Sequence, residues 1–381
     1  MRPLLVISKT GLTLLASGVL LYFSARAQGK VYTTSDGVKF RVETIVSKLE
    51  VPWSIAFDSS GDMYFTERVG RLSVLKKGEH QPSLIAQIDE AKPRGEGGLM
   101  GLTLHPGFSS KRLLYVTFTY SEGSAVHNKV VRFKLDAEKL TERKEIISSL
   151  PGSSVHNGCR IKFGPDGKLY VTAGDATKWE KAQDLTYLGG KILRMNDDGT
   201  RPADNPFPSS LVYVLGVRNP QGIDWNPTSG LLFETEHGPS GFEGKGGGGD
   251  EVNILDAGKN YGWPVIHHRE KRQGMEPPLL EYSPAVAPAS AAFYRGTVPA
   301  KFRNNLFFGC LRGERIERVI VSESDSRKVV KEEALLQDEF GRIREVAFGP
   351  DGFLYFSTSN RDGRGSPTDS DDRILRLVPV Q

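Results

Sequence analysis

The chain has 381 residues, of which 38% are hydrophobic and 25% are charged, as in an ordinary soluble globular protein. The net charge of +4 is small for this length, and no basic run is interleaved with aromatic residues, which argues against nucleic acid as a partner. The 42 glycines and 22 prolines fall at turns between strand-like runs, which favours one repetitive domain of many short strands.

The N-terminus carries a targeting segment. Basic residues precede an apolar run at 12–23, and Ala25-Arg26-Ala27 matches the small-x-small cleavage rule. We interpret residues 1–27 as a secretory signal peptide, because the apolar run is shorter than the ~20 residues of a membrane span. An uncleaved anchor is the alternative. The mature chain, residues 28–381, is then expected to be periplasmic or secreted, with no membrane span.

One sequence pattern recurs along the mature chain. An apolar residue, a Pro-Asp-Gly-like turn and an apolar-aromatic run appear six times, most clearly at 163–171 and 348–356. Proline presets the turn and glycine supplies positive φ, so each copy predicts a tight hairpin. Further strands at intervals of roughly 40–60 residues predict an all-β fold, a six-bladed β-propeller of four-stranded antiparallel blades. The charged segment 136–150 is expected to be a short helix or an excursion.

A histidine and an aspartate flank the cleanest hairpin. His156 lies just before the hairpin at 163–171, and Asp175 lies just after it. Because a hairpin brings its two ends together, these residues are expected to be neighbours, as a general base and its orienting carboxylate should be. The alternative is a structural hydrogen bond between a histidine and a turn.

Cations and amides from several repeats are expected to converge at one mouth of the central channel. Arg342 and Arg344 point the same way if their segment is a strand. Like charges on one face are costly unless an anion or an acidic partner lies there, so they indicate an anion site or an ion pair between blades. The full set of cations and amides is Arg218, Asn219, Gln221, Arg312, Arg342 and Arg344.

The segment 238–251 offers oxygen ligands. The turn at Gly238-Pro239 can present two carbonyl oxygens to a hard cation, and Asp250 and Glu251 supply carboxylates nearby. Calcium accepts such ligands with loose geometry, whereas a solvated loop pair is the alternative reading of Asp250 and Glu251. No Cys/His cluster has zinc spacing, and the glycine-rich segments lack the helix that a dinucleotide loop requires.

Several ordered motifs together give the chain a resemblance to a known family. The most specific are His156-Asn157-Gly158-Cys159-Arg160, Gly216-Val217-Arg218-Asn219-Pro220-Gln221-Gly222, Glu236-His237-Gly238-Pro239, Gly249-Asp250-Glu251-Val252-Asn253 and Asn260-Tyr261-Gly262-Trp263-Pro264. The chain resembles the soluble quinoprotein glucose/sorbosone dehydrogenases, and among them the aldose sugar dehydrogenases, over nearly its whole mature length. That resemblance implies a propeller enzyme with pyrroloquinoline quinone (PQQ) and calcium, which oxidises the anomeric carbon of aldoses to lactones and passes electrons to an external acceptor.

The resemblance also implies roles for particular residues. His156 would take the proton of the sugar hydroxyl, Asp175 would orient His156, and Arg218 would stabilise negative charge on the reduced quinone. The carbonyls of Gly238 and Pro239 would hold the calcium at the quinone. The family's pocket positions that hold the cofactor fall on Glu67, Asn219, Gln221, Arg312, Arg342 and Arg344, and those of a second, structural calcium fall on Glu251 and Tyr261.

The chain departs from the family pattern at three places, and two other classes of function remain as alternatives. Cys159 replaces a usual glycine, Arg312 replaces a frequent lysine, and residues 241–248 lengthen the metal loop. A calcium-dependent propeller lactonase would have no use for converging arginines, and a non-enzymatic carbohydrate-binding propeller would not need His156 beside Asp175. Cys159 and Cys310 are expected either to pair or to remain separate buried thiols.

Overall fold

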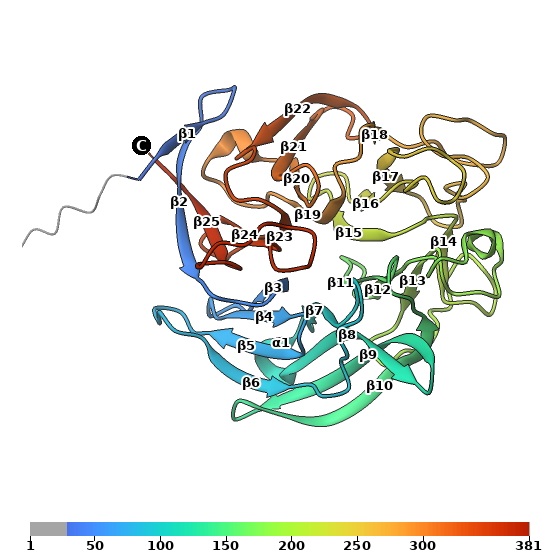
Figure 1. Cartoon of the computed structure of the whole chain (residues 1–381), viewed down its shortest axis with the longest axis horizontal. Helices are drawn as coiled ribbons and strands as arrows, with labels where there is room; N and C mark the ends of the chain where they lie inside the picture. Colours follow the sequence, from blue (N-terminus) through green and yellow to red (C-terminus); the bar gives the residue numbers. More distant parts are fainter. Residues whose placement is uncertain (1–28, 381) are drawn as a thin grey trace, which may run out of the picture.

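Six antiparallel sheets surround a central channel in the computed structural model, which describes residues 29–380 (Figure 1). The six-bladed propeller predicted from the repeats is confirmed. The expected signal peptide at 1–27 lies outside the described residues. Within residues 29–380 no helix is long and apolar enough to cross a membrane.

Each blade begins with an inner strand and then runs outward. The inner strands are β3 (Pro52–Phe57), β7 (Leu99–Leu104), β11 (Gly158–Phe163), β15 (Pro220–Trp225), β19 (Pro288–Phe293) and β23 (Ile343–Phe348). The second strands are β4 (Met63–Glu67), β8 (Leu113–Glu122), β12 (Leu169–Ala173), β16 (Leu232–Glu236), β20 (Asn305–Cys310) and β24 (Leu354–Thr358). The third strands are β5 (Arg71–Leu75), β9 (Ala125–Asp136), β13 (Lys191–Met195), β17 (Asp250–Leu255), β21 (Arg315–Val321) and β25 (Ile374–Pro379).

The outer strands complete the sheets. They are β6 (Ser83–Gln87), β10 (Lys139–Pro151), β14 (Val212–Leu215), β18 (Leu280–Tyr282), β22 (Val329–Leu335) and, in the last blade, β2 (Lys39–Val46) with β1 (Val31–Thr33). The only helical turns described are α1 (Phe108–Lys111), η1 (Trp179–Gln183) and η2 (Ala300–Phe302). The segment 136–150, expected to be a helix or an excursion, is mostly strand β10. Its charged side chains are tolerated because it forms the exposed outer edge of its sheet.

The two ends of the described chain close the ring. Strand β2 pairs antiparallel with β25, so the last blade combines segments from both ends (Figure 1). Arg318 of β21 reinforces this closure, because its guanidinium binds Asp36, in the turn after β1, at 2.9 and 3.0 Å. Each inner strand contacts the next around the channel, and β23 contacts β3.

The Gly-Pro-Asp-Gly turns create the inner hairpins in the way the sequence predicts. In the hairpin of β11 and β12, the Gly164 N–H donates to the Lys168 carbonyl at 2.9 Å, and Gly167 adopts φ +72°. Asp166 accepts the Lys168 N–H and the Tyr170 hydroxyl, each at 3.0 Å. These turns lie at one mouth of the channel, so the starts of the inner strands and the ends of the second strands meet at the other mouth.

The hydrophobic core lies between neighbouring sheets. Phe233 of one blade packs edge-on against Phe293 of the next, with ring centroids 4.9 Å apart, and both rings are fully buried. Such a buried side chain contributes roughly 1.5–3 kcal/mol. Cys159 and Cys310 are buried in different clusters and unpaired, so the disulfide alternative does not form in the described structure.

Candidate active site

A histidine and an aspartate form a buried pair at the mouth away from the turns. His156 precedes β11 and Asp175 follows β12, and pairing of Gly158 with Ala173 brings the strand ends together. His156 Nδ1 lies 2.8 Å from Asp175 Oδ1, which confirms that the two are neighbours. A side chain at Gly174 would collide with the His156 backbone, so this close approach requires glycine.

Asp175 is held in one orientation by further donors. Its carboxylate is fully buried, and besides His156 it accepts the Thr177 N–H at 2.8 Å and the Trp263 indole N–H at 2.9 Å. A buried carboxylate requires such partners to offset its desolvation. Because the carboxylate faces Nδ1, the imidazole proton is held there, and Nε2 is left to accept a proton.

A small polar cavity of about 140 Å³ lies in the same mouth and carries excess positive charge. It is lined by four arginines, two carboxylates, a histidine and Gln221, with backbone from neighbouring loops. The charged residues are Arg68, Arg342, Arg344, Arg364, Glu96 and Asp362, and the histidine is His237. Four guanidinium groups against two carboxylates favour an anionic ligand.

Arg342 and Arg344 both face this cavity, as their spacing predicts. Asp362 lies between them: its Oδ2 is 2.9 Å from the Arg342 side chain and 3.5 Å from that of Arg344. Burial lowers the pKa of Arg344 to about 10, with Asp362 opposing that shift. Gln221 Oε1 lies 3.4 Å from Arg344 Nη1. The acidic partner that two neighbouring arginines require is therefore supplied in part by the protein itself.

Arg218 and Asn219 are buried beside the His156–Asp175 pair. Asn219 Oδ1 accepts the Gly158 N–H at 3.1 Å, but its buried Nδ2 has no hydrogen-bond partner among residues 29–380. The Arg218 guanidinium binds the buried carboxylate of Glu243, a residue of the glycine-rich segment, and lies 5.3 Å from the Trp263 ring. An unpartnered buried donor beside an arginine fits a ligand rich in acceptor oxygens.

Only three of the residues predicted to hold the cofactor line this cavity, namely Gln221, Arg342 and Arg344. Two of the others, Glu67 and Arg312, have different surroundings. Glu67 binds Arg71 through two hydrogen bonds of 2.7 Å and faces another surface depression, while the next residue, Arg68, lines the cavity. Successive side chains at a strand point to opposite faces, so an offset of one residue reverses the direction. Arg312 follows β20 but is exposed, and the cavity is bordered by Leu311 instead.

Sequence reasoning missed several residues that follow second strands. Arg68 follows β4 and His237 follows β16 directly, at the position that Gly174 occupies after β12, one residue before Asp175. Asp362 lies further along the loop after β24. Extending the repeat by one residue past the second strands would have found Arg68 and His237. Burial lowers the pKa of His237 to about 4, so His237 is neutral at physiological pH. Glu96 and Arg364 lie in loops outside the repeat and carry no such signal.

The residues expected to hold the first calcium are close together but engaged. The Pro239 carbonyl accepts the Gly248 N–H at 3.2 Å, and Asp250 Oδ1 accepts the Gly238 N–H at 2.8 Å. Asp250 Oδ2 accepts the amides of Val286 and Ala287 at 2.7 and 2.6 Å. Asp250 therefore serves the loop backbone, and the Pro239 carbonyl would share its oxygen between a cation and the Gly248 N–H.

Glu251 belongs to a buried group of three carboxylates around one amide. Asn253 Nδ2 lies 3.1 Å from both Glu234 Oε2 and Glu251 Oε2, and 3.5 Å from Glu236 Oε1. Burial raises the pKa of Glu236 to about 7, and burial together with Glu236 raises the pKa of Glu234 and Glu251.

The same group has polar atoms without partners. Glu234 Oε1 and Asn253 Oδ1 are buried and make no hydrogen bond within the part of the chain that the structure describes, and such oxygens fit a hard cation. No cluster of three or more His, Cys, Asp or Glu side chains with metal-site geometry forms within residues 29–380. The Tyr261 hydroxyl donates to the Ile254 carbonyl at 2.6 Å and accepts the Asp256 N–H at 2.8 Å, so its hydrogen bonds are internal.

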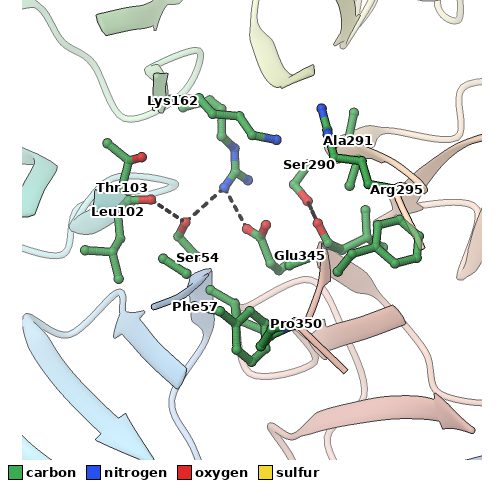
Figure 2. A pocket seen from close by; sticks show the side chains of 18 of the residues that line it. Ser54, Phe57, Leu102, Thr103, Lys162, Ser290, Ala291, Arg295, Glu345 and Pro350 are labelled. Carbon is green, nitrogen blue, oxygen red and sulfur yellow. Dashed lines mark hydrogen bonds and ion pairs between the residues drawn. The ribbon is translucent and has the colours of Figure 1, made fainter. Parts of the chain in front are cut away.

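The opposite mouth contains a separate cavity of about 580 Å³ (Figure 2). Its charges are paired within the protein: Arg160 binds Glu345 at 2.6 Å, while Lys162 and Arg295 bind Asp224 at 2.8 and 2.7 Å. Ser54 also accepts from Arg160 at 3.1 Å. None of the predicted site residues lines this cavity, and its cations are already matched by carboxylates.

Comparison with known proteins identifies relatives of this architecture. A family model described as glucose/sorbosone dehydrogenase matches residues 49–375. An aldose sugar dehydrogenase of Escherichia coli (strain K12) is 32% identical over 347 residues, which cover 84% of this chain and 91% of that protein. An oxidoreductase of Thermus thermophilus, described as a glucose dehydrogenase, is 42% identical, with a TM-score of 0.82 over 89% of this chain and 100% of the other.

A PQQ-bound aldose sugar dehydrogenase of Streptomyces coelicolor shares both fold and sequence with this chain. It is 32% identical, with a TM-score of 0.79, and the match covers 90% of this chain and 99% of that one. The region matched by the family model spans all six blades, from before β3 to within β25. The resemblance seen in the motifs is confirmed: this chain belongs to the glucose/sorbosone dehydrogenase family.

Proposed function

We propose that the protein is a PQQ- and calcium-dependent dehydrogenase that oxidises the anomeric carbon of aldose sugars. The observation that carries this proposal is the arginine-rich cavity in the same mouth as the His156–Asp175 pair. PQQ has three carboxylates, and the cavity's excess of guanidinium groups suits them. When bound, PQQ supplies the two-electron acceptor for oxidation of the sugar.

The chain's own residues would handle the proton. His156, with its Nδ1 hydrogen bonded to Asp175, accepts the proton of the anomeric hydroxyl at Nε2. Trp263 and Thr177 fix Asp175, and Asp175 in turn fixes the imidazole. The lactone would form as the hydroxyl proton passes to His156 and the anomeric hydrogen leaves with its electron pair as a hydride, for which bound PQQ would be the acceptor. The two electrons would then pass to an external acceptor.

Other side chains would hold the cofactor and the cation. Arg342, Arg344 and Gln221 face the cavity and would bind cofactor oxygens, while Asn219 offers its unpartnered amide. Calcium would take the carbonyls of Gly238 and Pro239 near the cofactor. A second calcium would lie at the group of Glu234, Glu236 and Glu251, where buried carboxylates lack a counter-charge.

One reconstitution experiment tests this function against a propeller hydrolase and a sugar-binding propeller. Purified protein treated with chelator is assayed with aldoses and a dye acceptor, and then again after addition of PQQ, calcium or both. Dye reduction that requires both additions supports the proposal. Sugar binding without turnover, or lactone hydrolysis that needs calcium alone, would assign the protein to one of the other classes.

The N-terminal motif supports a periplasmic or secreted location for this chemistry.

A further inference from the structure

The glycine-rich segment 240–248 places a carboxylate on Arg218. Glu243 Oε1 accepts from Arg218 Nε at 3.0 Å and also binds Nη2, and the two side chains are only 1% and 2% exposed. Ser240 strengthens the contact, because its hydroxyl accepts from Arg218 Nη2 at 2.9 Å and its N–H donates to Glu243 at 3.0 Å. With the His237 carbonyl on Nη1 at 3.0 Å, all three guanidinium nitrogens are engaged.

The neighbouring Phe242 covers the candidate base. Its ring lies nearly parallel to the His156 imidazole, with centroids 5.9 Å apart, and also contacts Trp179 at 6.0 Å. Phe242 is nevertheless 58% exposed, so no core holds it in place. The segment therefore covers two functional groups at once: Glu243 covers the arginine, and Phe242 covers the histidine.

Apart from Ser240 and Glu243, the segment is weakly tied to the propeller. Its described backbone contacts are local: a bridge between Ser240 and Gly247, and the Gly248 N–H donating to Pro239. Gly244 and Gly246 have φ of +73° and +77°, and a Cβ at either would meet nothing within 4 Å. Glycine is thus needed for backbone conformation, not space, and such a segment reorganises at low energetic cost.

The cavity in its present form is too small for a cofactor. Its volume of about 140 Å³ is below the roughly 300–1,000 Å³ typical of ligand sites. Arg218 does not line it, because Glu243 covers the guanidinium. An anionic ligand that uses Arg218 must exchange its own oxygen for that of Glu243.

We propose that Glu243 is an internal anion that holds Arg218 until the anionic cofactor displaces it, and that this exchange moves segment 240–248 outward and uncovers His156. The inference rests on the proposed function, since it assumes PQQ as the incoming anion. Loading of the cofactor then opens the sugar's route to the base, so the apo-protein presents a covered site. Release of Gly248 from the Pro239 carbonyl in the same movement would free a calcium ligand.

The affinity of PQQ for calcium-supplemented apo-protein tests the exchange without any turnover. Quenching of tryptophan fluorescence reports binding, since Trp263 contacts Arg218 and Trp179 contacts Phe242. Glu243→Gln keeps the shape and removes the competing charge, so PQQ should bind roughly tenfold to a hundredfold more tightly. Glu270→Gln, at an exposed carboxylate, is the matched control and should change nothing.

Limited trypsin digestion of the wild-type protein tests the movement and needs no variant. Lys245 lies inside the segment, and cleavage after it should become faster when PQQ is bound, although a bound ligand usually protects a protein. Equal PQQ affinity of wild type and Glu243→Gln, or protection of Lys245 by PQQ, would overturn the proposal and leave the proposed function standing. Failure of the wild type to bind PQQ at all would overturn both.

Discussion

Replacement of His156 by asparagine is the most direct test of the proposed chemistry. Asparagine is polar and similar in length but cannot accept the proton, so the variant should lose general-base catalysis. That contribution is typically ~10²–10⁴-fold, or about 2.7–5.4 kcal/mol of barrier. His156 is 4% exposed and its ring bonds only Asp175 among the described residues, so the loss should fall on turnover and not on cofactor binding.

Variants can test the role of His156 separately from that of its orienting residue, Asp175. Asp175→Asn replaces an acceptor of three hydrogen bonds by a group that must turn an N–H toward one of the donors His156, Thr177 or Trp263. One buried donor is then left without an acceptor, which costs roughly 1–3 kcal/mol of stability. Turnover should fall less than with His156→Asn, because the base is present but less well oriented. Trp263→Phe keeps the Asp175 charge and should cause the smallest loss.

The assay is single-turnover oxidation of an aldose by protein loaded with PQQ and calcium. Circular dichroism and urea unfolding establish that each variant is folded. Titration with PQQ, followed by quenching of tryptophan fluorescence, establishes that each variant binds the same amount of PQQ. The expected order of rates is wild type, Trp263→Phe, Asp175→Asn and then His156→Asn. A folded, fully loaded His156→Asn protein that oxidises sugar at the wild-type rate would refute the assignment of the base.

Three further predictions concern the cofactor, the metal and the ring closure. Arg344→Ala should weaken PQQ binding tenfold or more while leaving the sugar dependence unchanged, because a charge-assisted bond contributes roughly 1.5–3 kcal/mol; an unchanged titration would show that Arg344 serves only Asp362. Exhaustive chelation should abolish dye reduction and lower the unfolding temperature, both restored by calcium, because calcium bound only by the folded protein stabilises it; full activity of calcium-free protein would contradict this. Hydrogen bonds from Arg318 lower the pKa of Asp36 to about 2 from 3.8. A carboxyl group whose pKa is lowered in the folded state stabilises the fold when the pH is above the pKa of the unfolded state. Asp36→Asn should therefore lower the free energy of unfolding by up to ~2 kcal/mol at neutral pH, and by less than this because solvent screens the partly exposed Asp36. Urea unfolding should show the difference between variant and wild type narrowing as the pH falls from 3.8 towards 2.

The fold was accessible from the sequence because the signal is local and repeated. A Gly-Pro-Asp-Gly turn with an aspartate to accept the next amide specifies its hairpin wherever it occurs, as at 163–171 and 348–356. The neighbouring positions of His156 and Asp175 followed from the same hairpin, since the two residues flank a short antiparallel pair. The segment 136–150 was misjudged because its charges look unlike a strand, whereas an outer edge strand tolerates them.

The composition of the site depended on the tertiary structure. Sequence alone showed that arginines were numerous, but only the closed ring brings Arg68, Arg342 and Arg364 from the first and last blades around one cavity. Successive side chains at the end of a strand point to opposite faces, so an error of one residue in position changes which side chain faces the cavity. For this reason the sequence assigned Glu67 to the site that Arg68 occupies. The contact of Glu243 with Arg218 joins residues with no repeat relationship. Local turn chemistry therefore determined the blades. Contacts between distant segments decided which charged side chains meet, and that Arg218 is already paired with a carboxylate.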